Sequence, residues 1–208
     1  MIDQRELDRL WDFADPIASE ARLREASLTA PAVDRAEYST QLARALGLQD
    51  RFDEARSLLD GIDPTSCTPA ALVRIDLERG RVENSAGRPA AAVPHFLHVA
   101  EAGAADGLDF LRIDALHMLA IADRDHAVDW TRQGVEAAAA SSDDRTRRWA
   151  VSLHNNLGWT LYEAGDLTGA IAEFEQALGW AEQVGTEDQR RYAREALDQA
   201  HSHLDESP

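Results

Sequence analysis

The chain has 208 residues, of which 44% are hydrophobic, and it contains 12 Gly, 7 Pro and one cysteine. Its formal charge of −17, from 38 acidic and 21 basic residues, disfavours binding to nucleic acid or to an anionic membrane because both would repel it. The lone Cys67 excludes an internal disulfide framework, no run of residues is apolar enough to cross a membrane, and no secretory signal opens the chain, so we expect a cytoplasmic protein.

Residues 1–30 predict a degenerate pair of short helices. The apolar positions of the first helix are Leu7, Leu10, Trp11 and Phe13. Asp15 and Pro16 then provide an N-cap and a first-turn proline for a second helix. The residues expected inside that helix are Ala18, Ala21 and Leu23.

A recurring signal follows along the chain: a turn, an alanine, three residues, and then a larger side chain. The alanines that anchor the four copies are Ala55, Ala92, Ala127 and Ala170, at spacings of 37, 35 and 43 residues. The Ala127 copy is compressed, because Leu119 precedes its alanine by 8 residues whereas Leu157 precedes Ala170 by 13. The first helix of that copy, or its turn, must therefore be shorter.

The segment from Leu157 to Ala177 carries the clearest copy. Gly158 lies on the same helical stripe as Leu157, and its missing side chain lets a second helix approach closely. Gly165 ends the first helix and Asp166 caps the second. The result is a helical hairpin with one apolar side uncovered, which predicts neighbouring hairpins.

This segment resembles a tetratricopeptide repeat, although His154 and Leu161 stand where the family usually has Trp and Tyr. The resemblance implies an all-α fold, a right-handed α-solenoid of about four to five antiparallel helix pairs with a C-terminal capping helix. In the copy around Gly80, three charged residues stand where the family pattern is apolar, which leaves the helix register open. They are Asp76, Arg79 and Glu83.

We expect one domain over residues 1–208. After the degenerate pair, the repeats are expected at residues 33–63, 69–102, 108–140 and 146–184. Thr186 and Gln189 have the spacing of a capping box, so a capping helix is expected at residues 187–206. Pro94 falls inside a predicted helix and should kink it or delay its start.

The first helix of each hairpin should line a concave groove. The groove positions are Arg44, Arg74, Arg81, Asn84, Asp114, His117, Asn155, Trp159 and Tyr162. Arginine and asparagine would bond to peptide carbonyls or carboxylates, and aromatic rings would cover apolar side chains. Two alternatives remain: Trp159 and Tyr162 pack against a neighbouring helix, and Arg74 and Arg81 form ion pairs with nearby acidic residues.

Sequence motifs for catalysis, metals or cofactors are missing. The seven histidines form no His-Glu-x-x-His pattern, and His95 with His98 has no acidic ligand at helical spacing. Asp114 and His117, with His154 from the next repeat, are the one cluster that would suit acid-base or metal chemistry. We therefore expect no catalytic residues, no metal site and no cofactor.

The sequence favours a non-catalytic adaptor that binds a protein or peptide in its groove, with neither nucleic acid nor membrane as partner. A homo-oligomer is compatible with it. The first alternative is a self-associating or ligand-sensing regulatory module, which would need a closed pocket. The second is an enzyme that uses the region of Asp114 and His117.

Overall fold

The computed structural model describes residues 2 and 4–206, and over this range its regular elements are all helical. The chain divides into two compact units, Met1–Leu111 and Arg112–Pro208, each of which is described by itself. The all-α prediction is confirmed. None of the described helices combines the length and the apolar character needed to span a membrane.

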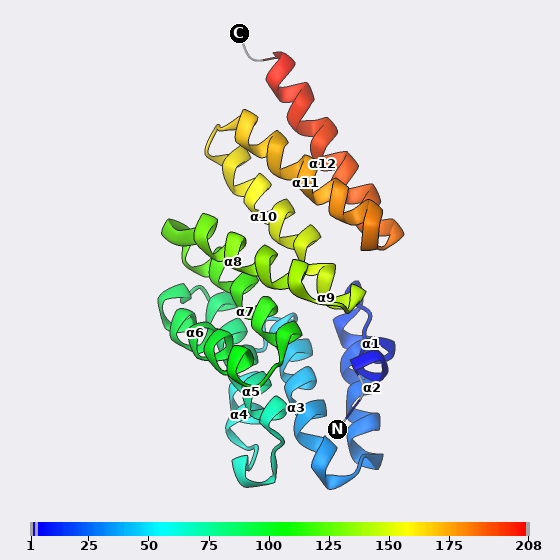
Figure 1. The fold of residues 1–208 in the computed structure, drawn as a ribbon. Helices are drawn as coiled ribbons and strands as arrows, with labels where there is room; N and C mark the ends of the chain where they lie inside the picture. The colour runs from blue at the N-terminus through cyan, green and yellow to red at the C-terminus, as the bar shows by residue number, and fades with distance from the viewer. Residues whose placement is uncertain (1, 3, 207–208) are drawn as a thin grey trace. The chain divides into compact units, whose positions relative to one another are not determined.

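The first unit is built from helices joined by short turns (Figure 1). In chain order they are α1 (Gln4–Leu10), α2 (Pro16–Thr29), α3 (Ala32–Gly47), α4 (Phe52–Asp60), a 3₁₀ turn η1 (Pro64–Ser66), α5 (Pro69–Ser85), α6 (Pro89–Ala105) and the start of α7 (Asp109–Ala122). From α1 to α6 each helix packs on the next, and α3 also packs on α5. The helix pairs α3–α4 and α5–α6 lie almost entirely within the ranges expected for the repeats at 33–63 and 69–102.

The second unit contains most of α7 and the remaining helices. These are a 3₁₀ turn η2 (Arg124–His126), α8 (Ala127–Ala140), α9 (Asp144–Arg147), α10 (Trp149–Glu163), α11 (Leu167–Val184) and α12 (Glu187–Glu206). Helix α11 packs on both α10 and α12, which appear beside it in yellow and red in Figure 1. Helix α7 ends three residues after Leu119, whereas α10 continues six residues past Leu157, so most of the compression of the Ala127 copy falls in its first helix and the rest in the segment that follows.

Glycine allows two pairs of helices to approach closely, as the spacing predicted for Gly158. A Cβ atom on Gly158 would lie 2.5 Å from Cε1 of Phe174, and one on Gly80 would lie 2.4 Å from Cε1 of Phe96. Both phenylalanine side chains are fully buried. The register of α5 is therefore the one that places Gly80 against α6.

The expected caps are present. The Asp15 carboxylate accepts a hydrogen bond from the Ala18 amide at 2.9 Å, and Pro16 occupies the first turn of α2. Thr186 and Gln189 exchange both hydrogen bonds of a capping box, at 3.0 and 3.2 Å. Gly165 has a φ of 84°, in the region that favours glycine, so it can reverse the chain after α10.

Two expectations need correction, and one alternative stated for Pro94 is excluded. The first helix ends at Leu10, so Trp11 and Phe13 lie in the following turn. The Ser19 hydroxyl accepts from the Asp12 amide at 2.8 Å and donates to the Asp12 carbonyl at 2.9 Å, which holds the turn in place of another helical turn. Ala21 is exposed, and Ser19 is buried in its stead beside Leu23. Helix α6 begins at Pro89 and runs through Pro94, so Pro94 does not delay its start.

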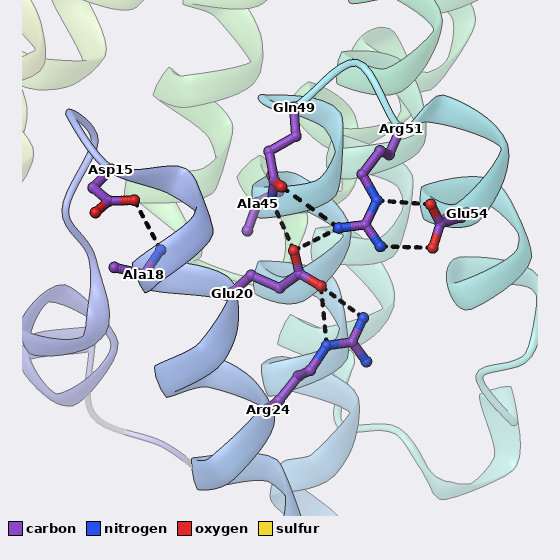
Figure 2. Close-up of polar contacts among 8 residues, drawn as sticks. All are labelled: Asp15, Ala18, Glu20, Arg24, Ala45, Gln49, Arg51 and Glu54. Carbon is purple, nitrogen blue, oxygen red and sulfur yellow. Dashed lines mark hydrogen bonds and ion pairs between the residues drawn. The ribbon is translucent and has the colours of Figure 1, made fainter.

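A polar cluster ties α2 to the turn between α3 and α4 (Figure 2). The Glu20 carboxylate accepts from Arg24 at 2.8 Å, from Gln49 at 2.8 Å and from Arg51 at 2.7 Å. Arg51 also donates two hydrogen bonds of 2.7 Å to Glu54. Burial by itself would raise the pKa of Glu20, but the hydrogen bonds and the arginine charges outweigh it and hold that pKa below its ordinary value.

Candidate functional site

Two adjacent helices of the first unit carry a row of polar side chains along the faces that pack together. We name this set the α3–α5 polar row: Glu37, Gln41 and Arg44 on α3, and Arg74, Glu78 and Arg81 on α5. Both helices use the spacing i, i+4, i+7, which keeps the three side chains on one face. The row contains three of the predicted groove arginines.

Two of these arginines are held in ion pairs that are largely buried. Nε of Arg74 lies 2.9 Å from a carboxylate oxygen of Glu37, and Arg81 donates to Glu78 at 2.5 Å. The side chains of Arg74 and Arg81 are only 11% and 12% exposed, and those of the two glutamates 3% and 1%. The pairing with Glu78 is one that the sequence suggested, whereas Glu37 comes from another helix and was not foreseen.

At Arg44 the row meets two aromatic rings that come from the turn after α1. Trp11 and Phe13 stack with ring centroids 4.9 Å apart, and the guanidinium of Arg44 lies 5.6 Å and 5.2 Å from the two centroids. Nε1 of Trp11 donates to Gln41 at 2.8 Å, which fixes the indole. Phe13 is 61% exposed. We name Trp11, Phe13, Gln41 and Arg44 the N-terminal aromatic surface.

The predicted groove positions of α10 point mainly toward neighbouring helices of the second unit. Trp159 contacts Phe174 of α11, with centroids 5.1 Å apart, and it meets Tyr162 edge to face at 5.3 Å. The hydroxyl oxygen of Tyr162 lies 3.0 Å from Nδ1 of His203 on α12. Both rings are half-buried, as is Asn155, whose side-chain oxygen has no hydrogen-bond partner among the described residues. Trp159 therefore packs on α11 and Tyr162 contacts α12, as in the alternative in which these rings pack against a neighbouring helix.

The remaining predicted positions lie on α5 and α7. Asn84 is half-buried near the end of α5. Asp114 is only 3% exposed. Nε2 of His117 lies 2.6 Å from Nδ2 of Asn156 on α10, and the His117 ring lies against the Trp149 ring in a tilted arrangement. His154 pairs with Glu173 of α11 at 2.7 Å, so its ring has a partner of its own.

A third polar cluster was missed from the sequence. Asp76 of α5 meets both α6 histidines, with Nδ1 of His95 at 3.3 Å and Nδ1 of His98 at 2.7 Å. Helical spacing reveals an acidic partner only on the helix that carries the histidines, whereas this carboxylate comes from the neighbouring helix. Across the part of the chain that the structure describes, no group of three or more His, Cys, Asp or Glu residues is arranged to hold a metal ion.

Comparison with known proteins adds a structural likeness. Neither a protein-family model nor a curated protein sequence matches the chain. The fold is similar to the crystal structure of BtubC (BKLC) from P. vanneervenii, with a TM-score of 0.57 over 97% of this chain and 93% of that one. The two sequences are 16% identical, so the likeness concerns the helical fold alone.

Proposed function

We propose that this chain is a non-catalytic adaptor built from tetratricopeptide-type helix pairs, and that it binds an extended segment of a partner protein at the N-terminal aromatic surface. The observation that carries the proposal is the exposed Phe13 ring, which stacks on Trp11 beneath the Arg44 guanidinium. A buried core would cover such a ring, and its exposure suits recognition of another chain.

The repeat assignment rests on how the helix pairs pack. Gly158 against Phe174 and Gly80 against Phe96 place a small residue of a first helix on a large one of the second, in two copies far apart in sequence. Ala170 and Ala92, two of the anchoring alanines, are fully buried. This recurrence supports a tetratricopeptide-type arrangement, in which the first helices present the binding residues.

The N-terminal aromatic surface offers two kinds of contact to a peptide. The open face of Phe13 can cover an apolar side chain, and the Arg44 guanidinium can donate to a backbone carbonyl or a carboxylate. Arg74 and Arg81 form ion pairs with Glu37 and Glu78. We assign those two arginines to holding α3 and α5 in shape, and Arg44, whose guanidinium lies 5.2 Å from the centroid of the exposed Phe13 ring, to the partner.

A capture experiment tests the proposal. The tagged protein is incubated with lysate of its native source, and captured proteins are identified by mass spectrometry for the wild type, Phe13→Ala and Arg44→Ala. We expect both variants to lose the same partner while keeping their circular dichroism spectra and unfolding temperatures. Leu28→Ala serves as the control, because Leu28 is an apolar side chain of the same unit that is 82% exposed and lies outside the surface.

Equal capture by the wild type and by both variants would contradict the proposal. Sedimentation of the purified protein separates this outcome from self-association, since a homo-oligomer that dissociates in Phe13→Ala would favour the regulatory alternative. A small-molecule ligand would show itself as a gain in unfolding temperature without a captured protein.

A further inference from the structure

A pocket of about 400 Å³ opens in the first unit, away from the α3–α5 polar row. Asp76 and Arg79, which line it, follow Arg74 by two and five residues, so they lie on the opposite side of α5. The apolar lining includes Leu59, Ile62, Leu72, Val73, Ile75 and Ala102. Leu72 is 42% exposed at its mouth, and the deeper Leu59 and Val73 are buried.

The wall formed by the loop between α4 and α5 is fixed by its own hydrogen bonds. The Asp63 carboxylate accepts from the amide and the hydroxyl of Thr65 at 2.9 and 2.8 Å, which lowers the pKa of Asp63. The Thr68 hydroxyl caps α5 by accepting from the Ala71 amide at 3.1 Å. These bonds hold the loop that carries the lining residues Ile62, Pro64 and Pro69, which reduces the cost of ordering this wall on binding.

The rim of the pocket favours a cation. Asp106 is exposed where α6 ends, and the carbonyls at a helix C-terminus add partial negative charge there. The Asp76 carboxylate faces His95, His98 and Arg79. The Arg79 guanidinium lies 3.7 Å from this carboxylate and 3.0 Å from that of Asp60, so it is closer to Asp60. Among the residues that line the pocket, the carboxylates of Asp76 and Asp106 outnumber the one guanidinium, that of Arg79.

We propose that this pocket binds a segment of a partner protein in which a bulky aliphatic side chain stands next to an arginine or lysine. The aliphatic side chain lies against Val73 and Ala102, and the cation pairs with Asp106 and Asp76. The pocket shares no residue with the N-terminal aromatic surface, so it is a second binding site whose existence does not depend on the proposed function.

The test is a titration of the ¹⁵N-labelled protein, followed by NMR, with the capped dipeptide N-acetyl-Leu-Arg-amide. We expect saturable shifts of the backbone amides of Leu72, His98 and Ala102. Two matched probes, N-acetyl-Ser-Arg-amide and N-acetyl-Leu-Glu-amide, should bind more weakly, because the first lacks the aliphatic group and the second reverses the charge.

Protein variants locate the site. Ala102→Leu should fill the pocket and abolish the shifts, while Asp106→Asn should weaken binding about two- to fivefold, as expected for one exposed charge pair. Glu163→Gln, an exposed acidic position in the second unit, is the control and should bind as the wild type does.

Three results would overturn the inference: no saturable shift up to about 10 mM dipeptide, equal affinity for the three probes, or unchanged binding by Ala102→Leu. Shifts confined to the amides of Trp11, Phe13 and Arg44 would also overturn it, and would place the peptide on the N-terminal aromatic surface instead. The two sites can thus fail independently.

Discussion

At Gly158 a single methyl group decides how closely two helices pack. The Cβ of an alanine there would meet Phe174 at 2.5 Å, and Phe174 is fully buried. Overpacking costs about 1–3 kcal/mol, against a gain in helix propensity of up to about 1 kcal/mol. We expect Gly158→Ala to lower the free energy of unfolding by about 1–2 kcal/mol in urea titrations.

Gly179 provides the matched control on the partner helix. No atom lies within 4 Å of the Cβ that an alanine would place there. Gly179→Ala should therefore stabilise the protein by about 0.5–1 kcal/mol through helix propensity alone. Equal effects of the two substitutions would show that the contact with Phe174 is not tight.

The Arg81–Glu78 pair illustrates a second effect at the scale of the residue. Arg81→Ala would leave the Glu78 carboxylate, which is 1% exposed, without its donor, and breaking a buried pair costs about 3 kcal/mol or more. The double substitution Glu78→Leu with Arg81→Met should recover much of this loss, because an apolar pair needs no compensating charge.

Unfolding in urea measures both variants. Arg132→Ala is the control, since its ion pairs with Asp129 and Glu136 join side chains that are more than 60% exposed, and it should change stability by less than about 0.5 kcal/mol. A similarly small effect of Arg81→Ala would mean that Glu78 finds another donor or water.

At the scale of the element, Glu20 links α2 to the α3–α4 turn, and its lowered pKa makes that link depend on pH. The folded-state pKa lies below the unfolded value, so the stabilisation is fully present above the unfolded pKa of about 4.3 and is lost as pH falls through the folded pKa. Glu20→Gln should cost about 1–3 kcal/mol at pH 7, the usual range for hydrogen bonds to a charged group.

The difference between wild type and Glu20→Gln should shrink as pH falls below about 4, where the wild-type carboxylate gains a proton. Thermal unfolding between pH 7 and pH 3 measures it. Glu54→Gln is the comparison, because Glu54 pairs with the same Arg51 but is 59% exposed and should matter less. A constant difference across this pH range would show that the Glu20 charge does not contribute.

Local patterns in the sequence predicted the elements well, and contacts between elements poorly. Helix ends follow from a cap or a glycine within a few residues, as at Asp15, Gly165 and Thr186. The burial of the polar row depends on how α3 packs on α5, and the partner of Arg74 lies 37 residues away at Glu37. No spacing within one helix reveals such a pairing.

The same limit applied to the candidate sites. Trp11 and Phe13 were read as core residues because they are aromatic, and only the turn held by Ser19 brings them beneath Arg44. Asp76 meets His95 and His98 across two helices, so a search along one helix could not find it. Side chains that act together from different elements need the packed structure to be recognised.

At the scale of the whole molecule, the formal charge of −17 acts on every element at once. Acidic residues outnumber arginines, so ion pairs leave a surplus of negative charge whose repulsion opposes the compact state. Salt screens this repulsion, and it also screens the exposed ion pairs, which contribute little each. We expect the repulsion to dominate, so that raising NaCl from about 0.05 to about 0.5 M increases the unfolding temperature by about 2–4 °C, equivalent to about 1 kcal/mol.

A variant with three fewer negative charges separates the two effects of salt, which are the screening of the repulsion and the screening of the ion pairs. Glu101→Gln, Glu163→Gln and Glu175→Gln replace exposed carboxylates and leave the formal charge at −14, that is, −17 plus 3. This variant should unfold at a higher temperature than the wild type in low salt and respond less to added NaCl, because less repulsion remains to be screened. If salt instead lowered the unfolding temperature of both proteins, the ion pairs of the arginines, rather than the surplus of acid, would govern the electrostatic stability of the fold.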